Sequence, residues 1–178
     1  MRFTLRVFVL ALPVAALAQS RFVDEDESIL FAKVQLEKDA AQQIRYLTEW
    51  ESRYPQTYFA SNRCERFSAA YERLQMYHEA FHYAVVCAAL ESAGPEALHR
   101  VVLLARTLAS PTAAELNATV QSARLILEAV HGLPRSTATQ PDERRVENMI
   151  RDLRSQDALR MRRDARDALA WAGRQRHP

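Results

Sequence analysis

The fold of this chain is decided by residues 61–90, which read SNRCERFSAAYERLQMYHEAFHYAVVCAAL. Both halves of the stretch place apolar side chains at steps of three and four, and these are Cys64, Phe67, Tyr71 and Leu74, then Tyr77, Phe81, Ala84 and Ala88. Such steps bring side chains to one face of an α-helix. The stretch therefore predicts two helices that fold against each other as a hairpin, with the turn near Tyr77.

Helix signals continue on both sides of this hairpin. Acidic residues at 24–27 open a first short helix, and Pro55 stops a second one. Pro95 starts another helix. Thr112 and Glu115 have the capping-box spacing that marks the start of a regular amphipathic helix. Every signal in this part of the chain is helical.

The last quarter of the chain combines a loop with an arginine-rich helix. Turn formers without an apolar period occupy residues 133–140. After Pro141 a charged helix carries an apolar stripe that skips near Gln156, so the helix drifts or breaks there. We therefore predict an all-α protein, an antiparallel stack of helical hairpins with about seven helices.

Two segments resemble the tetratricopeptide repeat (TPR), a helical hairpin that stacks into a solenoid. Residues 76–90 are similar to its turn and second helix, where an aromatic residue, Glu-Ala and a large apolar residue recur. Residues 50–60, WESRYPQTYFA, resemble the first repeat boundary of exported TPR-like proteins of acidobacteria and related bacteria. The chain departs from that pattern because its turn at 75–77 lacks Gly or Asn and no fixed period of about 34 residues is visible.

The resemblance implies a short TPR-like α-solenoid over residues 19–178. It assigns repeat packing to Trp50, Tyr54, Pro55, Phe59, Phe67, Tyr71, Leu74, Tyr77, Ala80 and Phe81. In such proteins the first helices of the hairpins line a concave face that holds a protein or peptide, and here that face would draw on Arg63, Arg66, Glu72 and Arg73. Residues 168–171 look like the opening helix of another repeat, which favours a shortened member of the family.

The first 18 residues have the pattern of a secretory signal peptide. Arg2 and Arg6 precede the apolar run 7–12, and small residues at 16–18 form the cleavage site. A membrane anchor is the alternative, but the run is shorter than the ~20 residues that a spanning helix needs. We expect cleavage after Ala18 and an exported product, periplasmic or secreted, without a membrane span.

The net charge of the chain limits the class of partner that it can bind. The chain carries 24 basic and 22 acidic side chains, and removal of Arg2 and Arg6 leaves 22 of each in the exported product. A product this close to neutral does not favour a nucleic-acid partner. Basic and acidic residues are interspersed in the C-terminal helix, which favours a solvated helix with i,i+4 ion pairs over a basic surface for an acidic partner or a membrane.

Residues 78–82, HEAFH, match the HExxH motif of zinc metallopeptidases. Two histidines four residues apart share one helix face and can bind one metal ion, and the adjacent Glu can act as general base. However, no Gly-x-x-His follows His82, and the downstream Glu91, Glu96 and Glu115 sit in no ligand motif. We therefore expect no catalytic residue and no metal or other cofactor, with a zinc-dependent metallopeptidase as the alternative.

Two cysteines lie on the two arms of the predicted hairpin. An even number of cysteines in an exported protein permits a disulfide between Cys64 and Cys87. The arms differ by three residues about Tyr77, or roughly 4.5 Å of helix rise. The sequence leaves both a bridge and two buried thiols open.

These observations favour a non-catalytic, exported interaction scaffold that binds a protein or peptide. The zinc peptidase is the second hypothesis. The third is a fragment of a longer repeat protein without independent function, which predicts self-association through the C-terminal helix near Trp171.

Overall fold

The computed structural model describes residues 21–91, 93–131 and 157–176. These residues form seven helices and no strand, which confirms the all-α prediction. The helices are α1 (Glu25–Leu36), α2 (Ala40–Arg53), α3 (Ala60–Arg73), α4 (Tyr77–Ala89), α5 (Pro95–Ala105), α6 (Ala113–His131) and α8 (Asp157–Arg176). The predicted signal peptide (1–18), the loop 133–140 and the first part of the helix predicted after Pro141 lie outside the described residues.

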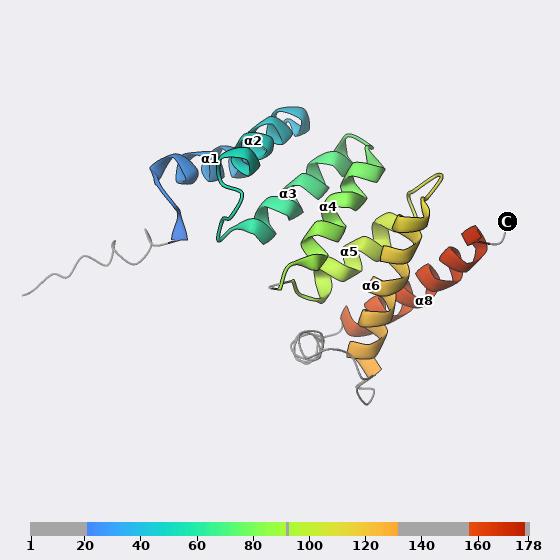
Figure 1. Cartoon of the computed structure of the whole chain (residues 1–178). Coiled ribbons are helices and arrows are strands. Elements are labelled where there is room, and N and C mark those ends of the chain that lie inside the picture. The colour runs from blue at the N-terminus through green and yellow to red at the C-terminus, as the bar shows by residue number, and fades with distance from the viewer. Residues whose placement is uncertain (1–20, 92, 132–156, 177–178) are drawn as a thin grey trace, which may run out of the picture.

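The helices lie in a row that follows the order of the sequence (Figure 1). α1 pairs with α2, α3 with α4 and α5 with α6, and each pair contacts the next. α8 packs on both α6 and α5, at the opposite end of the row from α1 (Figure 1). None of the described helices is both long and apolar enough to cross a membrane.

Short polar contacts set the helix N-termini. Asp24 caps α1 and Asp39 caps α2, and each side chain accepts a hydrogen bond from a backbone N–H three residues later, at 2.8 and 2.7 Å. At the start of α6 the Glu115 N–H donates to Thr112 Oγ1 (3.2 Å) and the Thr112 N–H donates to Glu115 Oε2 (2.7 Å). This reciprocal pair is the capping box that the sequence predicts.

The turn between α3 and α4 is closed without glycine. Gln75 adopts a φ of 59°, in the left-handed region. The Met76 N–H donates to the Tyr71 carbonyl (3.0 Å) and the Gln75 N–H donates to the Glu72 carbonyl (2.9 Å). This Schellman pattern ends α3, and Gln75 stands at the position where glycine is usual because a Cβ is strained there.

Replacing Gln75 with glycine should raise the free energy of unfolding by about 0.5–1 kcal/mol, because relief of the left-handed strain exceeds the entropy that glycine adds to the unfolded chain. Chemical denaturation measures the change. Gln75→Ala is the matched control, since it keeps the Cβ and should not stabilise. If Gln75→Gly lowered the stability instead, that result would contradict the left-handed conformation of Gln75.

The buried side chains form two clusters. The first lies between α1, α2 and α3 and contains Leu30, Val34, Leu47, Trp50, Tyr54 and Phe67. The second lies between α4, α5, α6 and α8 and is centred on Phe81, Val101, Val102, Ile126, Ala165 and Ala168. Tyr71 packs against both clusters, so the two halves of the row meet at α3 and α4.

The residues that the resemblance assigns to repeat packing differ in burial. Trp50, Tyr54, Phe67, Ala80 and Phe81 are buried, and Phe59, Tyr71 and Tyr77 pack against the clusters. The other two residues are exposed. Pro55 is exposed in the α2–α3 connection, and Leu74 is 40% exposed because it caps the C-terminus of α3 just before the turn.

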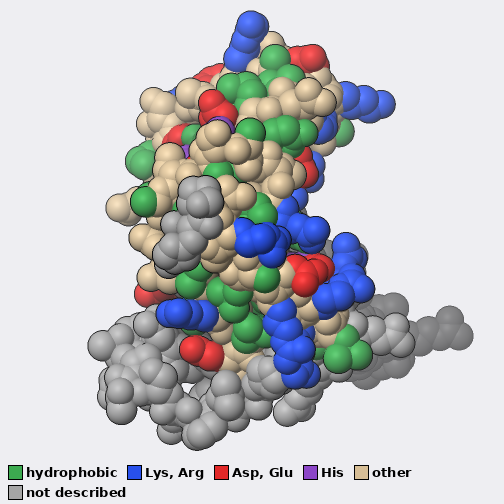
Figure 2. Space-filling model, turned by 90° about the vertical axis from the view of Figure 1, so that its right-hand side faces the viewer, with side chains coloured by type: hydrophobic (Ala, Val, Ile, Leu, Met, Phe, Trp, Pro, Cys, Tyr) green, Lys and Arg blue, Asp and Glu red, His purple; other side chains and the backbone are tan. Residues whose placement is uncertain are grey.

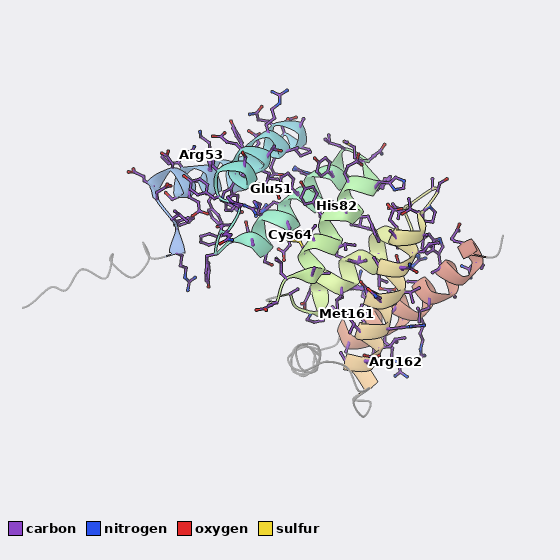
Figure 3. The ribbon with its side chains drawn as sticks, viewed as in Figure 1. Glu51, Arg53, Cys64, His82, Met161 and Arg162 are labelled. Carbon is purple, nitrogen blue, oxygen red and sulfur yellow. A yellow bond between two sulfur atoms is a disulfide. The ribbon has the colours of Figure 1, made fainter. Side chains whose placement is uncertain are left out.

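A disulfide joins Cys64 on α3 to Cys87 on α4, with Cα atoms 5.5 Å apart (Figure 3). The turn centres on Gln75 rather than on Tyr77, so Cys64 lies eleven residues before it and Cys87 twelve residues after it. Nearly equal arms place the two residues at the same height on antiparallel helices. Of the two alternatives that the sequence leaves open, the structure contains the bridge.

A buried carboxylate, Glu27, ties α1 to its neighbours. Its Oε1 atom accepts hydrogen bonds from Trp50 Nε1 (3.0 Å) and from the Thr57 hydroxyl, and its Oε2 atom accepts one from the Val23 N–H (2.7 Å). Burial of Glu27 opposes its ionisation, but these three hydrogen bonds outweigh burial and lower its pKa. The carboxylate is therefore a charged structural link between α1, α2 and the α2–α3 connection.

Candidate protein-binding surface

The HEAFH motif lies on α4, and both of its histidines are exposed. His78 Nδ1 lies 2.7 Å from Glu115 Oε1 on α6, whereas the His82 ring contacts Tyr83 edge-on. Burial of Glu115 opposes its ionisation, but hydrogen bonds from Thr112 and His78 lower its pKa. No group of three or more metal-ligating side chains comes together among the described residues. The zinc hypothesis therefore stays a prediction from the motif alone.

The charged residues expected on a concave face all make contacts within the chain. Arg63 is buried and donates to the carbonyls of Tyr54 (2.6 Å) and Pro55 (3.2 Å). Arg66 donates to Gln35 on α1, and Arg73 donates to Gln43 on α2 and to the Lys38 carbonyl. Glu72 pairs with Arg100 on α5 (2.7 Å). These four side chains hold the row together, which the sequence could not show.

Two tyrosines have raised pKa values that arise from structural contacts. The hydrogen bond that Tyr54 donates to Asp24 Oδ1 (2.6 Å) is the main cause that raises its pKa to about 12. Burial and the charge of Glu51 raise the pKa of Tyr83 to about 12. Both phenols are therefore neutral near pH 7 and serve as hydrogen-bond donors.

α8 is held against α5 by a buried polar contact. His99 Nε2 on α5 lies 2.8 Å from Asp164 Oδ2 on α8, and both side chains are almost fully buried. Small residues face inward on the same helix, and Ala165, Ala168 and Ala172 are fully buried. Asp164 therefore points into the protein, and it also lies within ion-pair distance of Arg160 Nε (3.9 Å) and Arg163 Nε (3.8 Å). The Arg160–Asp164 pair has the i,i+4 spacing that the sequence predicts.

The outward face of α8 is basic. Arg160, Arg163, Arg166 and Arg174 are exposed, whereas Asp167 is the one exposed acid among the α8 side chains that the structure describes. Together with Arg106, the C-terminal cap of α5, these four arginines form what we call the arginine surface. Figure 2 views the molecule from the side on which α8 lies, and blue side chains gather there around a smaller acidic patch.

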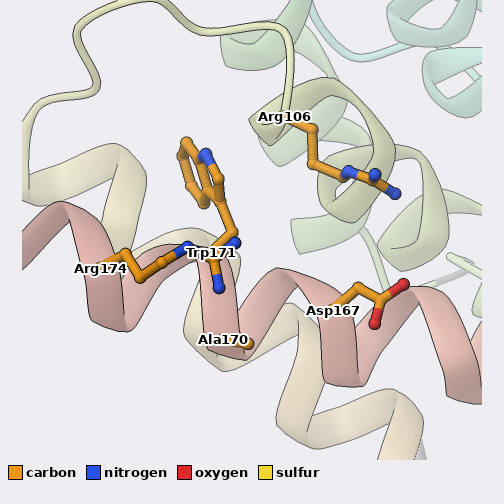
Figure 4. A pocket seen from close by; sticks show the side chains of 5 residues that line it. All are labelled: Arg106, Asp167, Ala170, Trp171 and Arg174. Carbon is orange, nitrogen blue, oxygen red and sulfur yellow. The ribbon is translucent and has the colours of Figure 1, made fainter.

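A hollow of about 390 Å³ lies where the end of α5 meets α8 (Figure 4). It is lined by Arg106, Asp167, Ala170, Trp171 and Arg174. Arg106 reaches it from α5, and the other four residues come from α8. Trp171 is half-buried against the second cluster, so packing holds its ring in place beside the two guanidinium groups.

A second hollow, of about 290 Å³, continues along α8 and shares Asp167 with the first. Its other lining residues are Leu159, Arg162, Arg163 and Arg166. The Leu159 side chain is 73% exposed. Within the part of the chain that the structure describes, the buried Nε atom of Arg162 has no hydrogen-bond partner (Figure 3). Both hollows thus place arginine donors beside one large apolar side chain.

This arrangement suits recognition of another protein. Trp and Arg are the residues that most often dominate the binding energy of protein interfaces. Guanidinium groups form paired hydrogen bonds with carboxylates. The arginine surface can therefore bind a protein segment in which carboxylates stand beside apolar side chains.

The sequence shows the arginine run of α8 but not its surroundings. Arg106 lies on another helix, and the inward turn of Asp164 depends on His99, 65 residues away in the chain. No family model, curated protein or solved structure matches this chain. The function is therefore argued from the described residues, beginning with the arginine surface.

Proposed function

We propose that the chain is a non-catalytic, exported scaffold of TPR-like helical hairpins that binds a protein partner through the arginine surface. The observation that carries this proposal is the pair of adjoining hollows on α8, where arginines flank Trp171 and Leu159. Two large apolar side chains among exposed arginines add little to the stability of the folded chain. At a protein interface, both kinds of side chain contribute binding energy.

Links between alternate helices support the solenoid part of the proposal. Gln35 on α1 donates to Asn62 on α3 (2.8 Å), and Arg100 on α5 donates to Ser68 on α3 (2.8 Å). The first helices of the three hairpins are thereby tied to one another in sequence order. Stacking of each hairpin on its neighbours alone is the architecture of an α-solenoid.

Two features support export. Residues 1–18 have the pattern of a signal peptide. The Cys64–Cys87 bridge fits an oxidising compartment, where disulfides form and persist. Both features accord with a protein that works outside the cytoplasm.

Photo-crosslinking from inside the first hollow tests the proposal. Ala170 lines that hollow and is replaced by benzoylphenylalanine, which cross-links on irradiation to whatever lies within reach. Glu65, exposed on α3 in the middle of the row, receives the same residue as the matched control. In the cells that export the protein, we expect a discrete cross-linked protein from position 170 and none of the same mass from position 65.

The combination of the cross-link with Arg166→Glu provides the second readout. This substitution should remove the cross-linked product, because the partner is held by the arginines of both hollows. A product that forms equally from both positions, or that survives Arg166→Glu, would contradict binding through the arginine surface.

A further inference from the structure

We propose that the partner of the arginine surface is the α1 end of a second copy of this chain, so that copies associate head to tail. The inference rests on the proposed function, because it names the occupant of the same surface. It follows from the charge of the two ends of the row, from an uncovered apolar stripe on α1, and from the matching lengths of the two helices.

The charge changes steadily along the row. Residues 21–53 contain eight acidic and five basic side chains, for a net charge of −3. The net charge is −1 over residues 54–91 and zero over residues 93–131. Residues 157–176 contain six basic and three acidic side chains, for a net charge of +3. The two ends of the row therefore carry opposite charges of equal size.

α1 is apolar on two sides. Its inner side buries Glu27, Leu30 and Val34. The outer side carries exposed residues at steps of three and four, and with the neighbouring Asp26 we call them the α1 face: Glu25, Asp26, Ile29, Ala32 and Leu36. Exposed Lys33 lies beside Ile29 and Leu36 on the same side. Ile29 is 45% and Leu36 80% exposed. An apolar stripe on both sides is typical of a helix that is covered on both sides.

The α1 face and the arginine surface have matching chemistry. Glu25 is an exposed carboxylate, the group that guanidinium binds best, whereas Asp26 already pairs with Arg53 on α2 (2.6 Å). Ile29 and Leu36 are of a size to occupy the hollows beside Trp171 and Leu159. From Glu25 to Leu36 the α1 face spans about 16 Å, and from Leu159 to Trp171 the arginine surface spans about 18 Å. One helix can therefore lie along the other over its whole contact face.

Other occupants fit less well. A nucleic acid is not favoured, because the exported product has as many acidic as basic side chains and its α1 end is negative. A membrane would find little apolar area to insert into the bilayer, because Trp171 is half-buried and Asp167 stands between the hollows. A second copy supplies acids and apolar side chains together.

A head-to-tail contact joins two different patches, so two copies leave one arginine surface and one α1 face open. Association therefore continues beyond the dimer, into open rows or closed rings. Sedimentation velocity of the purified exported protein should show average mass rising with concentration in dilute salt. Raising the salt about tenfold should weaken the association by at least about tenfold, because the ends attract through exposed charges.

Charge reversal of each end gives the decisive test. Arg166→Glu with Arg174→Glu changes the α8 end from +3 to −1, and Glu25→Arg with Asp26→Arg changes the α1 end from −3 to +1, since each reversal shifts the charge by two. Either double variant alone should associate about tenfold or more weakly than the unaltered chain. An equimolar mixture of the two should associate again, because each variant then meets a partner of opposite charge.

The matched control reverses the same kind of charge in the middle of the row. Glu65→Arg with Glu79→Arg alters exposed residues of α3 and α4, and it should leave association unchanged within about twofold. Circular dichroism confirms that every variant is folded. A chain that stays monomeric at about 100 µM in dilute salt, or a mixture that does not recover association, would overturn the inference.

The cross-link at Ala170 separates failure of this inference from failure of the proposed function. A product that contains α1 of a second copy supports both. A product with a different protein supports the proposed function and overturns the head-to-tail contact. No product from position 170, together with a monomeric chain, overturns both.

Discussion

Replacing Glu27 with alanine should lower the free energy of unfolding by about 4 kcal/mol and the melting temperature by about 10 °C. The substitution leaves the buried donors of Trp50 and Thr57, and the Val23 N–H, without their acceptor. Each buried donor left unpaired costs about 1–3 kcal/mol. Denaturant titration followed by tryptophan fluorescence measures the loss directly, because Trp50 is fully buried in the first cluster.

The pH dependence of stability gives a second readout for Glu27. Its folded-state pKa is lowered below the ordinary value of 4.5, so the stabilisation is present above that pH and is lost as the pH falls through the folded-state pKa. Glu27→Gln removes the charge but keeps the size and one acceptor. It should cost less than alanine and should weaken the acid dependence between about pH 5 and 2. If Glu27→Gln lost stability at low pH just as the unaltered chain does, other carboxylates would be the cause of the acid dependence.

Removal of the disulfide has the second largest expected effect. The bridge closes a loop of 23 residues, so replacing both cysteines with alanine should lower the free energy of unfolding by about 3 kcal/mol. For a domain of this size the melting temperature should fall by about 6–12 °C. Differential scanning calorimetry of the double variant and of the unaltered chain measures the shift.

Reduction provides the control for that experiment. A reducing agent should lower the melting temperature of the unaltered chain toward that of the cysteine-free variant and leave the variant unchanged. Mass spectrometry after thiol alkylation should find Cys64 and Cys87 unmodified before reduction and both modified after it. Alkylation of either cysteine in the folded, unreduced protein would contradict the bridge.

Local signals in the sequence predict the helices well. The capping box at Thr112, the stop at Pro55 and the start at Pro95 each depend on neighbouring residues alone, and each coincides with a helix boundary in the structure. The sequence predicts the hairpin turn two residues too late, near Tyr77, because Gln75 carries the left-handed conformation without the glycine that normally marks it.

The candidate surface was much harder to predict. The arginines of α8 are visible in the sequence, and so is the i,i+4 spacing that pairs Arg160 with Asp164 (3.9 Å). Asp164 also contacts His99, on a helix 65 residues earlier, and no local pattern encodes this long-range contact. The hollows likewise need Arg106 from α5 beside Trp171 from α8. Conversely, Arg63 and Arg73 looked available for a partner and are occupied by backbone and amide groups of the same chain.

The Cys64–Cys87 bridge also bears on how the row responds to tension. It links α3 to α4, between the cluster that involves α1, α2 and α3 and the cluster that involves α4, α5, α6 and α8. Under the proposed function, a partner held at one end would load the row along its axis, and that load would pass from one cluster to the other through these two helices. A covalent bond withstands forces that separate packed side chains. Under load, the outer helices should therefore peel away first, while the centre of the molecule stays intact.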